Sequence, residues 1–515
     1  MTADAASTTV SRQILADLWR YLPAKIVPAL TPLITVPVYT HLFTPHEYGL
    51  YVLAFGVAEL LLAVAATGLA TGAVRFYALY RREQRLASYF TAVPASLGFM
   101  IVASTGITVL VLLAFRPRIA PDVYPLLWIA LPAFIAAAVS EVLMNILRAQ
   151  ERSRSYALVE VANRAGTVIT SLALVFLCGL GVSALLWGQA LTLTVIAIPL
   201  AVCLTRGIRL DRRTHQPTLP ADLRRILGFS LPLAVGNIAF WVLRLSDRYF
   251  IEGFRDSHEV GLYSISYNVA SRSIFLVVGL FMLVPGPIMM RTWENEGREA
   301  AEAVLTRLSR AFLVLVLPAV VGFCVLARYA ITLLAADEYL AGYRAAWLIA
   351  GAMFAQGLGE LASLGVVLGM QTRLLARNQC VAAVVNVILN TVLISLWGFM
   401  GAAASAFLAF VLLSALHARA SDRYLTWRWP TGTMLRVGLA SGVMGIAVSL
   451  SASRLEHWSR LPQTPTYALA LIGSMGVGMV VYGGMLWLTG EVSPATLRSL
   501  LRPGDQTVPN VMSLG

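Results

Sequence analysis

Long apolar runs separated by short polar loops make up almost the whole sequence. A helix needs about 20 mostly apolar residues to cross the hydrocarbon core of a membrane, and windows of about 19 residues find such segments along the entire chain. The predicted spans cover residues 18–43, 48–73, 89–114, 122–147, 157–179, 182–205, 226–252, 261–289, 309–334, 344–369, 376–397, 399–418, 435–453 and 466–488. This pattern predicts an all-α fold, a polytopic transmembrane helical bundle of about fourteen helices.

A basic, proline-containing loop divides these spans into two blocks of six, with two helices left over. The predicted domains are a cytoplasmic N-terminal tail at 1–17, an N-lobe of six transmembrane helices at 18–205, a cytoplasmic inter-lobe loop at 206–225, a C-lobe of six transmembrane helices at 226–418, a cytoplasmic loop with two extra transmembrane helices at 419–488, and a cytoplasmic C-terminal tail at 489–515.

A short repeat supports the division into two blocks. His46-Glu47-Tyr48-Gly49-Leu50-Tyr51 recurs as His258-Glu259-Val260-Gly261-Leu262-Tyr263, with five of six positions identical, and each copy lies between the first and second helix of its block. Because each block has an even number of spans, the blocks are expected to be parallel repeats about an axis along the membrane normal. The sequence therefore predicts two pseudo-symmetric six-helix lobes that enclose a central path.

Composition agrees with a membrane protein. Hydrophobic residues make up 58% of the 515 residues and charged residues only 13%, against about 25% charged in a typical soluble domain. The function is therefore expected to lie within the membrane. The cysteines are scattered without a CxxC pair, which indicates neither a disulfide framework nor a zinc site; they are Cys178, Cys203, Cys324 and Cys380.

The formal net charge of +13 comes from arginines that punctuate the apolar runs. They do not form one basic surface interleaved with aromatic residues, so nucleic acid is not an expected partner. Arginine in alternate loops matches the positive-inside rule and predicts that both termini are cytoplasmic. The opposite loops hold only Arg116, Arg118, Arg255, Arg454 and Arg460.

Motifs for energy conversion and catalysis are missing from the sequence. It contains no GxxxxGK[ST] phosphate loop, so ATP hydrolysis by the P-loop route is not expected. It also lacks HExxH, GxSxG, EF-hand and dense His/Cys patterns, which argues for a transporter rather than an enzyme and predicts no cofactor and no metal site.

Ionisable residues inside predicted spans are the strongest functional signal. A charge at the centre of a membrane helix costs about 2.5 to 3.5 kcal/mol on insertion scales and must face protein or water. Arg244, Asp247 and Arg248 share one face of the seventh helix at i, i+3 and i+4. One interpretation is that these arginines bind substrate; the alternative is that Arg244 and Asp247 neutralise each other while Arg248 snorkels to the headgroups.

Other buried polar residues extend this set. Arginines that face a common lumen suit a phosphate or diphosphate group, because the guanidinium fork binds phosphate oxygens bidentately. Glu141 and Lys25 lie near cytoplasmic helix ends, where an interfacial role is expected instead. Asn386 and Asn390, at i and i+4, either line a path or bond neighbouring helices. The predicted substrate-binding residues are Asn163, Arg164, Arg244, Arg248 and Arg272, and the predicted ion-coupling residues are Glu59, Asp247 and Glu360.

Several segments carry a resemblance to a known family. They are the opening Thr44-Pro45-His46-Glu47-Tyr48-Gly49-Leu50-Tyr51, the seventh-helix stretch Ser246-Asp247-Arg248-Tyr249-Phe250-Ile251 and the later Asp337-Glu338-Tyr339. With these motifs, residues 15 to 420 resemble the Wzx-type oligosaccharide-lipid flippases of polysaccharide biosynthesis, in the multidrug/oligosaccharidyl-lipid/polysaccharide exporter superfamily. The chain departs from that pattern in using almost only arginine as its basic residue and in its two extra C-terminal helices.

The resemblance implies a function and a location. It implies a flippase in the bacterial cytoplasmic (inner) membrane that moves an undecaprenyl-diphosphate-linked oligosaccharide, for example a unit of exopolysaccharide or O-antigen, by alternating access. Implied partners are the lipid-linked oligosaccharide, membrane lipid and the polysaccharide polymerase and export machinery. Two alternatives remain at this point: a cation-coupled drug exporter of the same superfamily, and a membrane polysaccharide polymerase or ligase, which the short outer loops disfavour.

Overall fold

The computed structural model describes residue 31 and residues 34–206, 219–427, 429–458 and 463–491. Within these ranges, thirteen helices are long and apolar enough to cross a membrane. They coincide with the second to fourteenth predicted spans, so the prediction of an all-α, multi-pass membrane bundle is confirmed. Most of the first predicted span, 18–43, lies outside the described residues, although residues 34–42 are helical.

Two halves of the chain supply the helices. The first half contains α2 (Pro45–Leu62), the π-helix η1 (Ala63–Thr67), α3 (Gly68–Arg82), α4 (Leu86–Ala114), η2 (Arg116–Arg118), α5 (Val123–Ala149), α6 (Ser153–Cys178) and α7 (Ser183–Thr205). The second half contains α8 (Leu219–Phe254), α9 (Ser257–Phe281), α10 (Pro285–Glu296), α11 (Arg298–Leu334), η3 (Asp337–Gly342), α12 (Tyr343–Leu368), α13 (Thr372–Trp397), α14 (Phe399–Ser421), α15 (Thr431–Trp458) and α16 (Gln463–Leu488).

Both copies of the repeat begin a helix with a side-chain cap. Thr44 and Glu47 form a capping box at α2, in which the Glu47 amide donates to Thr44 Oγ1 at 3.3 Å and the Thr44 amide donates to Glu47 Oε2 at 2.9 Å. At the equivalent position before α9, Asp256 accepts from the Glu259 amide at 2.8 Å. Such caps satisfy amide groups that have no partner within the helix, so the same local signal starts both helices.

The two repeats pack against each other. A Cβ atom at Gly49 in α2 would collide with the carbonyl group of Ser257, and one at Gly261 in α9 would collide with that of Pro45. Gly49 corresponds to Gly261 in the repeat, and Pro45 to Ser257, so the contact is symmetric. Glycine is required here because only a residue without Cβ lets the two backbones approach so closely.

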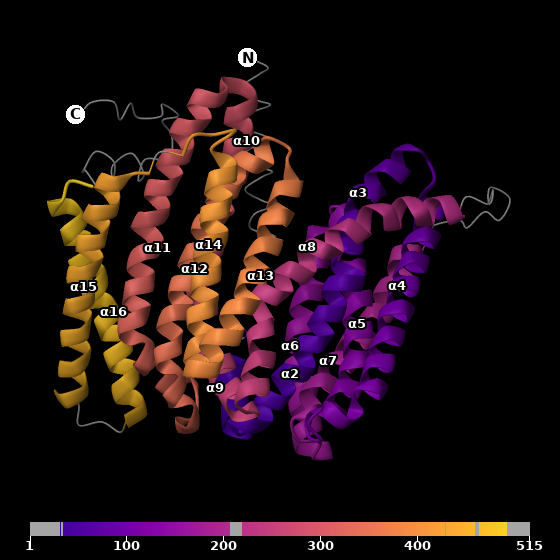
Figure 1. Cartoon of the computed structure of the whole chain (residues 1–515), viewed down its shortest axis with the longest axis horizontal. Coiled ribbons are helices and arrows are strands. Elements are labelled where there is room, and N and C mark those ends of the chain that lie inside the picture. Colours follow the sequence, from indigo (N-terminus) through magenta and orange to yellow (C-terminus); the bar gives the residue numbers. More distant parts are fainter. Residues whose placement is uncertain (1–30, 32–33, 207–218, 428, 459–462, 492–515) are drawn as a thin grey trace.

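The long helix α8 lies between the halves and runs diagonally across the bundle (Figure 1). On one side, Trp241 Nε1 donates to the Gly56 carbonyl at 3.0 Å and Tyr249 Oη donates to the Leu53 carbonyl at 2.8 Å, both in α2. On the other side, Gly236 faces Gln379 of α13. Helix α8 therefore contacts helices of both halves.

The start of α8 is anchored to the first half. Buried Asp222 accepts hydrogen bonds from Tyr80 Oη at 2.6 Å and from Arg85 Nη2 at 3.1 Å. The structure begins this helix at Leu219, earlier than the predicted residue 226. The lobe boundary at 226 stays a prediction, because α8 contacts both sides.

The last two helices pack on the outer edge of the second half, against α11 (Figure 1). Tyr329 Oη of α11 donates to Glu456 Oε2 of α15 at 2.8 Å, and Tyr482 Oη of α16 donates to the Val314 carbonyl at 2.7 Å. These contacts place α15 and α16 away from the interface between the halves, where α2, α8 and α9 meet.

The two ends of the bundle differ in charge. The last turns of α3 and α5 and the loops that follow them lie at one end and carry Arg81, Arg82, Arg85, Arg148 and Arg152. We call this end the basic face. The α2–α9 contact lies at the other end, which we call the opposite face.

Candidate functional site

A cavity of about 840 Å³ lies between the two halves. The first half contributes lining residues from the segment before α2 and from α2, η1, α3, α5, α6 and α7, and the second half contributes α8 and α9. The lining reaches the basic face at Arg148 and Tyr156, which stand at the end of α5 and the start of α6. At the opposite face, α2 and α9 are in close backbone contact at Gly49 and Gly261.

Five of the eight residues predicted from sequence line this cavity. They are Glu59, Asn163, Arg164, Arg248 and Arg272. Arg244, Asp247 and Glu360 are not among its lining residues. Their predicted roles in binding and coupling stay predictions, and the geometry gives each a different environment.

Arg272 of α9 lines the cavity without a charged partner in the described ranges. Its side chain is exposed, and within the part of the chain that the structure describes it makes no ion pair and no hydrogen bond. Arg164 enters from α6 on the other half and pairs with Glu160 through Nε to Oε1 at 3.0 Å. Arg272 thus offers the cavity a guanidinium without a partner among the described residues, and Arg164 offers one that keeps several donors free beside its carboxylate.

Glu59 of α2 lies within electrostatic reach of three of the predicted arginines, Arg164, Arg244 and Arg272. Arg244 packs its guanidinium over the Phe240 ring, 5.5 Å from the centroid. Arginines of α6, α8 and α9 therefore act electrostatically on the one carboxylate that α2 contributes to the cavity.

Asp247 and Arg248 form a buried pair, which corrects the alternative pairing of Asp247 with Arg244. Arg248 Nη1 lies 2.6 Å from Asp247 Oδ1, and their exposures are 3% and 2%. Tyr263 of α9 donates to the other carboxylate oxygen of Asp247, and the guanidinium stacks over the rings of Tyr263 and Tyr267. Arg248 therefore does not snorkel to the membrane surface, because a carboxylate and two aromatic rings hold it inside.

The amide of Asn163 also keeps unused hydrogen-bonding capacity. Asn163 Nδ2 donates to Ser140 Oγ at 3.3 Å, whereas its Oδ1 atom is buried without a partner and the residue is only 7% exposed. A buried acceptor without a partner is costly, and its place in the cavity lining makes it available to a ligand.

Glu141 does not occupy the interfacial position expected from sequence. It lines the cavity, and its Oε2 atom is buried without a partner among the described residues. The position of Glu141 near a helix end favours the membrane interface. It gives no sign that α5 directs the face carrying Glu141 toward α2. Lys25, given the same expectation, lies outside the described residues.

Glu360 and the asparagine pair belong to the second half. Glu360 accepts from Gln356 Nε2 at 3.1 Å within α12. Asn390 Nδ2 donates to Asn386 Oδ1 at 3.1 Å, and Ser246 of α8 lies 3.5 Å from each side chain. The asparagines therefore bond neighbouring helices, as one of the two sequence interpretations proposed.

Sequence reasoning missed two stripes of lining residues. Tyr48, Tyr51 and Phe55 follow one face of α2, and Ser264 and Asn268 precede Arg272 on one face of α9. The spacing at i, i+4 and i+8 in α9 was readable, since such positions share a helix face. Uncharged residues, however, give no sign of whether that face meets lipid, protein or water.

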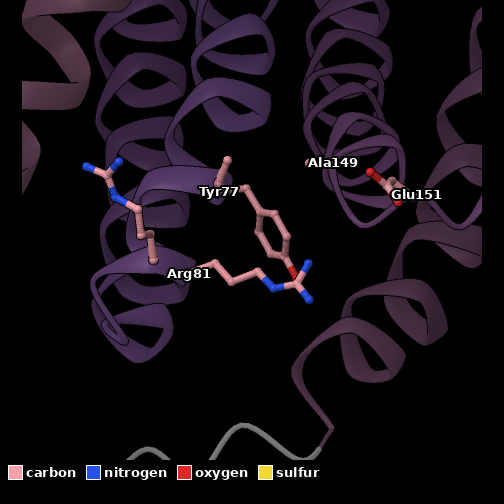
Figure 2. Close-up of a pocket in the computed structure, with 6 residues that line it drawn as sticks. Tyr77, Arg81, Ala149 and Glu151 are labelled. Atoms are coloured by element: carbon pink, nitrogen blue, oxygen red, sulfur yellow. The ribbon is translucent and has the colours of Figure 1, made fainter. Parts of the chain in front are cut away.

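A second, smaller pocket of about 430 Å³ lies at the basic face. Figure 2 shows Tyr77 and Arg81 on one side of it and Ala149 and Glu151 on the other. It is open and lies at the ends of α3 and α5, beside Arg148 of the main cavity. Of these two pockets, only the main cavity is lined by residues from both halves of the bundle.

Comparison with protein families gives a match across more than half of the chain. Residues 15–293 match the family model described as "Polysaccharide biosynthesis protein". A curated relative, described as a probable low-salt glycan biosynthesis flippase Agl15 from Haloferax volcanii, is 23% identical over 281 residues. That alignment covers 55% of this chain and 58% of the relative, so the chain spans less than two thirds of that protein's length.

Solved structures share the architecture at low sequence identity. The lipid II flippase MurJ in an inward closed conformation superimposes with a TM-score of 0.70 at 14% identity, covering 95% of this chain and 100% of that chain. An inward-facing MATE family multidrug transporter gives a TM-score of 0.62 at 13% identity, with 77% and 94% covered. These likenesses establish a common fold.

Proposed function

The chain belongs to the polysaccharide biosynthesis protein family, and from this premise we propose that it is a flippase for a lipid-linked oligosaccharide. The proposed substrate is an undecaprenyl-diphosphate-linked oligosaccharide, moved from the cytoplasmic to the periplasmic leaflet of the cytoplasmic membrane. No covalent bond is made or broken. The headgroup passes through the cavity while the lipid tail stays in the bilayer.

One observation carries the proposal: the unpaired guanidinium of Arg272 in a cavity between the halves. Arg164 lies on the facing half and within electrostatic reach of Arg272. A diphosphate presents several anionic oxygens, and guanidinium groups from two sides can bind them with charge-assisted, bidentate geometry. Such a group would also neutralise the like charges that the two arginines place close together.

The direction of transport follows from the charge of the two faces. The basic face is assigned to the cytoplasm, because arginine-rich loops are retained on that side. The cavity lining reaches this face, and the α2–α9 contact closes the other, so the conformation corresponds to an inward-facing state. The headgroup enters from the inner leaflet, and separation of Gly49 from Gly261 releases it outside.

Coupling is assigned to Glu59 among the three carboxylates named as ion sites. Glu59 lines the cavity, whereas Asp247 is held by Arg248 and Tyr263, and Glu360 lies in α12. A carboxylate among arginines exchanges partners when an anionic substrate arrives. The driving force is the membrane potential or a coupled cation, at about 2.3 kcal/mol per charge per 100 mV.

The test is genetic and chemical. Cells lacking this gene are expected to accumulate lipid-linked oligosaccharide on the cytoplasmic face and to lose surface polysaccharide. The wild-type gene should restore export and Arg272→Ala should not, whereas Arg154→Ala, an exposed arginine of the basic face, serves as the matched control. Normal surface polysaccharide in the deletion strain would overturn the proposal.

A further inference from the structure

The two copies of the repeat have aromatic residues at the same pair of positions, but the surroundings of these rings differ. Tyr51 and Phe55 of α2 correspond in the repeat to Tyr263 and Tyr267 of α9. In the second half, the Arg248 guanidinium covers both rings, 5.1 Å from the Tyr263 centroid and 4.5 Å from that of Tyr267. In the first half, no cationic side chain among the described residues covers Tyr51 or Phe55, and both rings line the cavity.

These two rings form a continuous apolar surface. Their centroids are 5.7 Å apart with an interplanar angle of 29°, and Tyr48 continues the row at 5.7 Å from Tyr51. The rest of the cavity lining mixes apolar residues with polar and charged ones. Covering this aromatic surface with an apolar face of a ligand removes apolar area from water, which favours binding.

Helix α9 contributes polar atoms without partners among the residues described to the lining of the same cavity. Ser264 is 1% exposed and its Oγ has no hydrogen-bond partner among the described residues. One turn further, Asn268 donates from Nδ2 to Tyr48 Oη at 3.2 Å, and no bond is recorded to its Oδ1 within the described chain. Both residues line the cavity with the rings, so a hydroxyl donor and an amide acceptor are available to a ligand that covers the aromatic row.

Ligand chemistry follows from this combination. A cation would suit the rings, but Arg272 and Arg164 line the same cavity and would repel it. A neutral ligand with one apolar C–H face and a polar edge fits better, and a pyranose ring has this form. Its C–H face stacks on the rings while its hydroxyl groups bond to Ser264 and Asn268.

We infer that the deep end of the cavity, formed by Tyr51, Phe55, Ser264 and Asn268, is a saccharide subsite separate from the arginines that bind the diphosphate. This inference rests on the proposed function. Ser264 and Arg272 are eight residues apart in α9, so the two subsites are separated by about 12 Å along the helix. The lipid-proximal diphosphate binds at Arg272, and the sugar it carries reaches the aromatic row toward the opposite face.

The test compares two probes on the full chain in phospholipid nanodiscs. They are undecaprenyl diphosphate and the undecaprenyl-diphosphate-linked oligosaccharide extracted from the deletion strain. Wild-type protein is expected to bind the glycosylated lipid about tenfold more tightly than the bare diphosphate. The Tyr51→Ala/Phe55→Ala variant should lose this preference and retain affinity for undecaprenyl diphosphate. Phe99→Ala, which removes an aromatic ring exposed on α4, should keep the preference.

A second variant keeps the test decisive if the Tyr51→Ala/Phe55→Ala protein does not fold. Ser264→Ala removes only the unpartnered hydroxyl, so it should weaken the preference while leaving binding of the bare diphosphate unchanged. Equal binding of both probes by wild-type protein, or a full preference in the double variant, overturns the saccharide subsite and leaves the proposed function standing. If wild-type protein binds neither probe, the proposed function itself is contradicted.

Discussion

Gly49 and Gly261 occupy the same position in the two repeats, and each lies against the backbone of the other's helix, Gly49 at Ser257 and Gly261 at Pro45. The two halves therefore touch through equivalent surfaces at the opposite face. A contact of this kind between small residues depends on close packing without interlocking side chains, so it can part as one unit. We propose this contact as the gate of the inward-facing conformation.

Gly261→Ala is expected to open this gate, because its Cβ has no room beside the Pro45 carbonyl. In protein whose native cysteines are replaced by alanine, Ser264→Cys should then react with a membrane-impermeant maleimide added from the periplasmic side. Gly253→Ala, which has open space around the added methyl group, is the matched control. If Ser264→Cys reacts no faster in Gly261→Ala than in protein that keeps Gly261, this contact does not close the cavity.

Asp247→Ala is expected to destabilise the fold strongly. It leaves Arg248 buried without its carboxylate, and removing one partner of a buried ion pair costs about 3 to 5 kcal/mol. Replacing both residues, as Asp247→Leu/Arg248→Met, should recover most of the loss because no uncompensated charge remains. Denaturant unfolding in detergent micelles measures both effects. Equal unfolding midpoints for wild type and Asp247→Ala would contradict the pairing.

The helices could be predicted from sequence, whereas the partners of their charges could not. Apolar length determines a membrane span, so the second to fourteenth spans were located correctly. For Asp247, the sequence spacing favoured Arg244, one turn away on the same helix, as the ion-pair partner. The deciding contacts come from Tyr263 and Tyr267 of another helix, and single-helix geometry contains no information about them.

The same lack of information about neighbouring helices explains which cavity residues could be predicted from sequence. Arg164 and Arg272 were expected in a lumen because a guanidinium in a membrane span must face protein or water, and both line the cavity. Glu141 was assigned to the interface from its place near a helix end. Ser264 gave no signal at all, since a serine in an apolar helix can bond its own backbone and needs no cavity.

Glu59→Gln should uncouple transport from its driving force. The amide keeps the shape of the carboxylate but removes the charge that lies among Arg164, Arg244 and Arg272. Proteoliposomes carrying this variant are expected to bind substrate, yet to flip it at a rate that no longer rises with an imposed membrane potential or cation gradient. Glu360→Gln, away from the cavity lining, should respond as wild type does. An unchanged response in Glu59→Gln would assign coupling elsewhere.

The central claim is that arginines in this cavity carry a diphosphate-linked oligosaccharide across the membrane. Proteoliposomes containing purified protein and a lipid-linked oligosaccharide labelled on its sugar report this directly, since a soluble glycosidase removes only the label on the outer leaflet. Wild-type protein should make nearly all of the label accessible, while Arg272→Ala should slow this at least tenfold and Arg154→Ala should not. Label that stays half protected with wild-type protein, or flipping by Arg272→Ala at the wild-type rate, would contradict the claim.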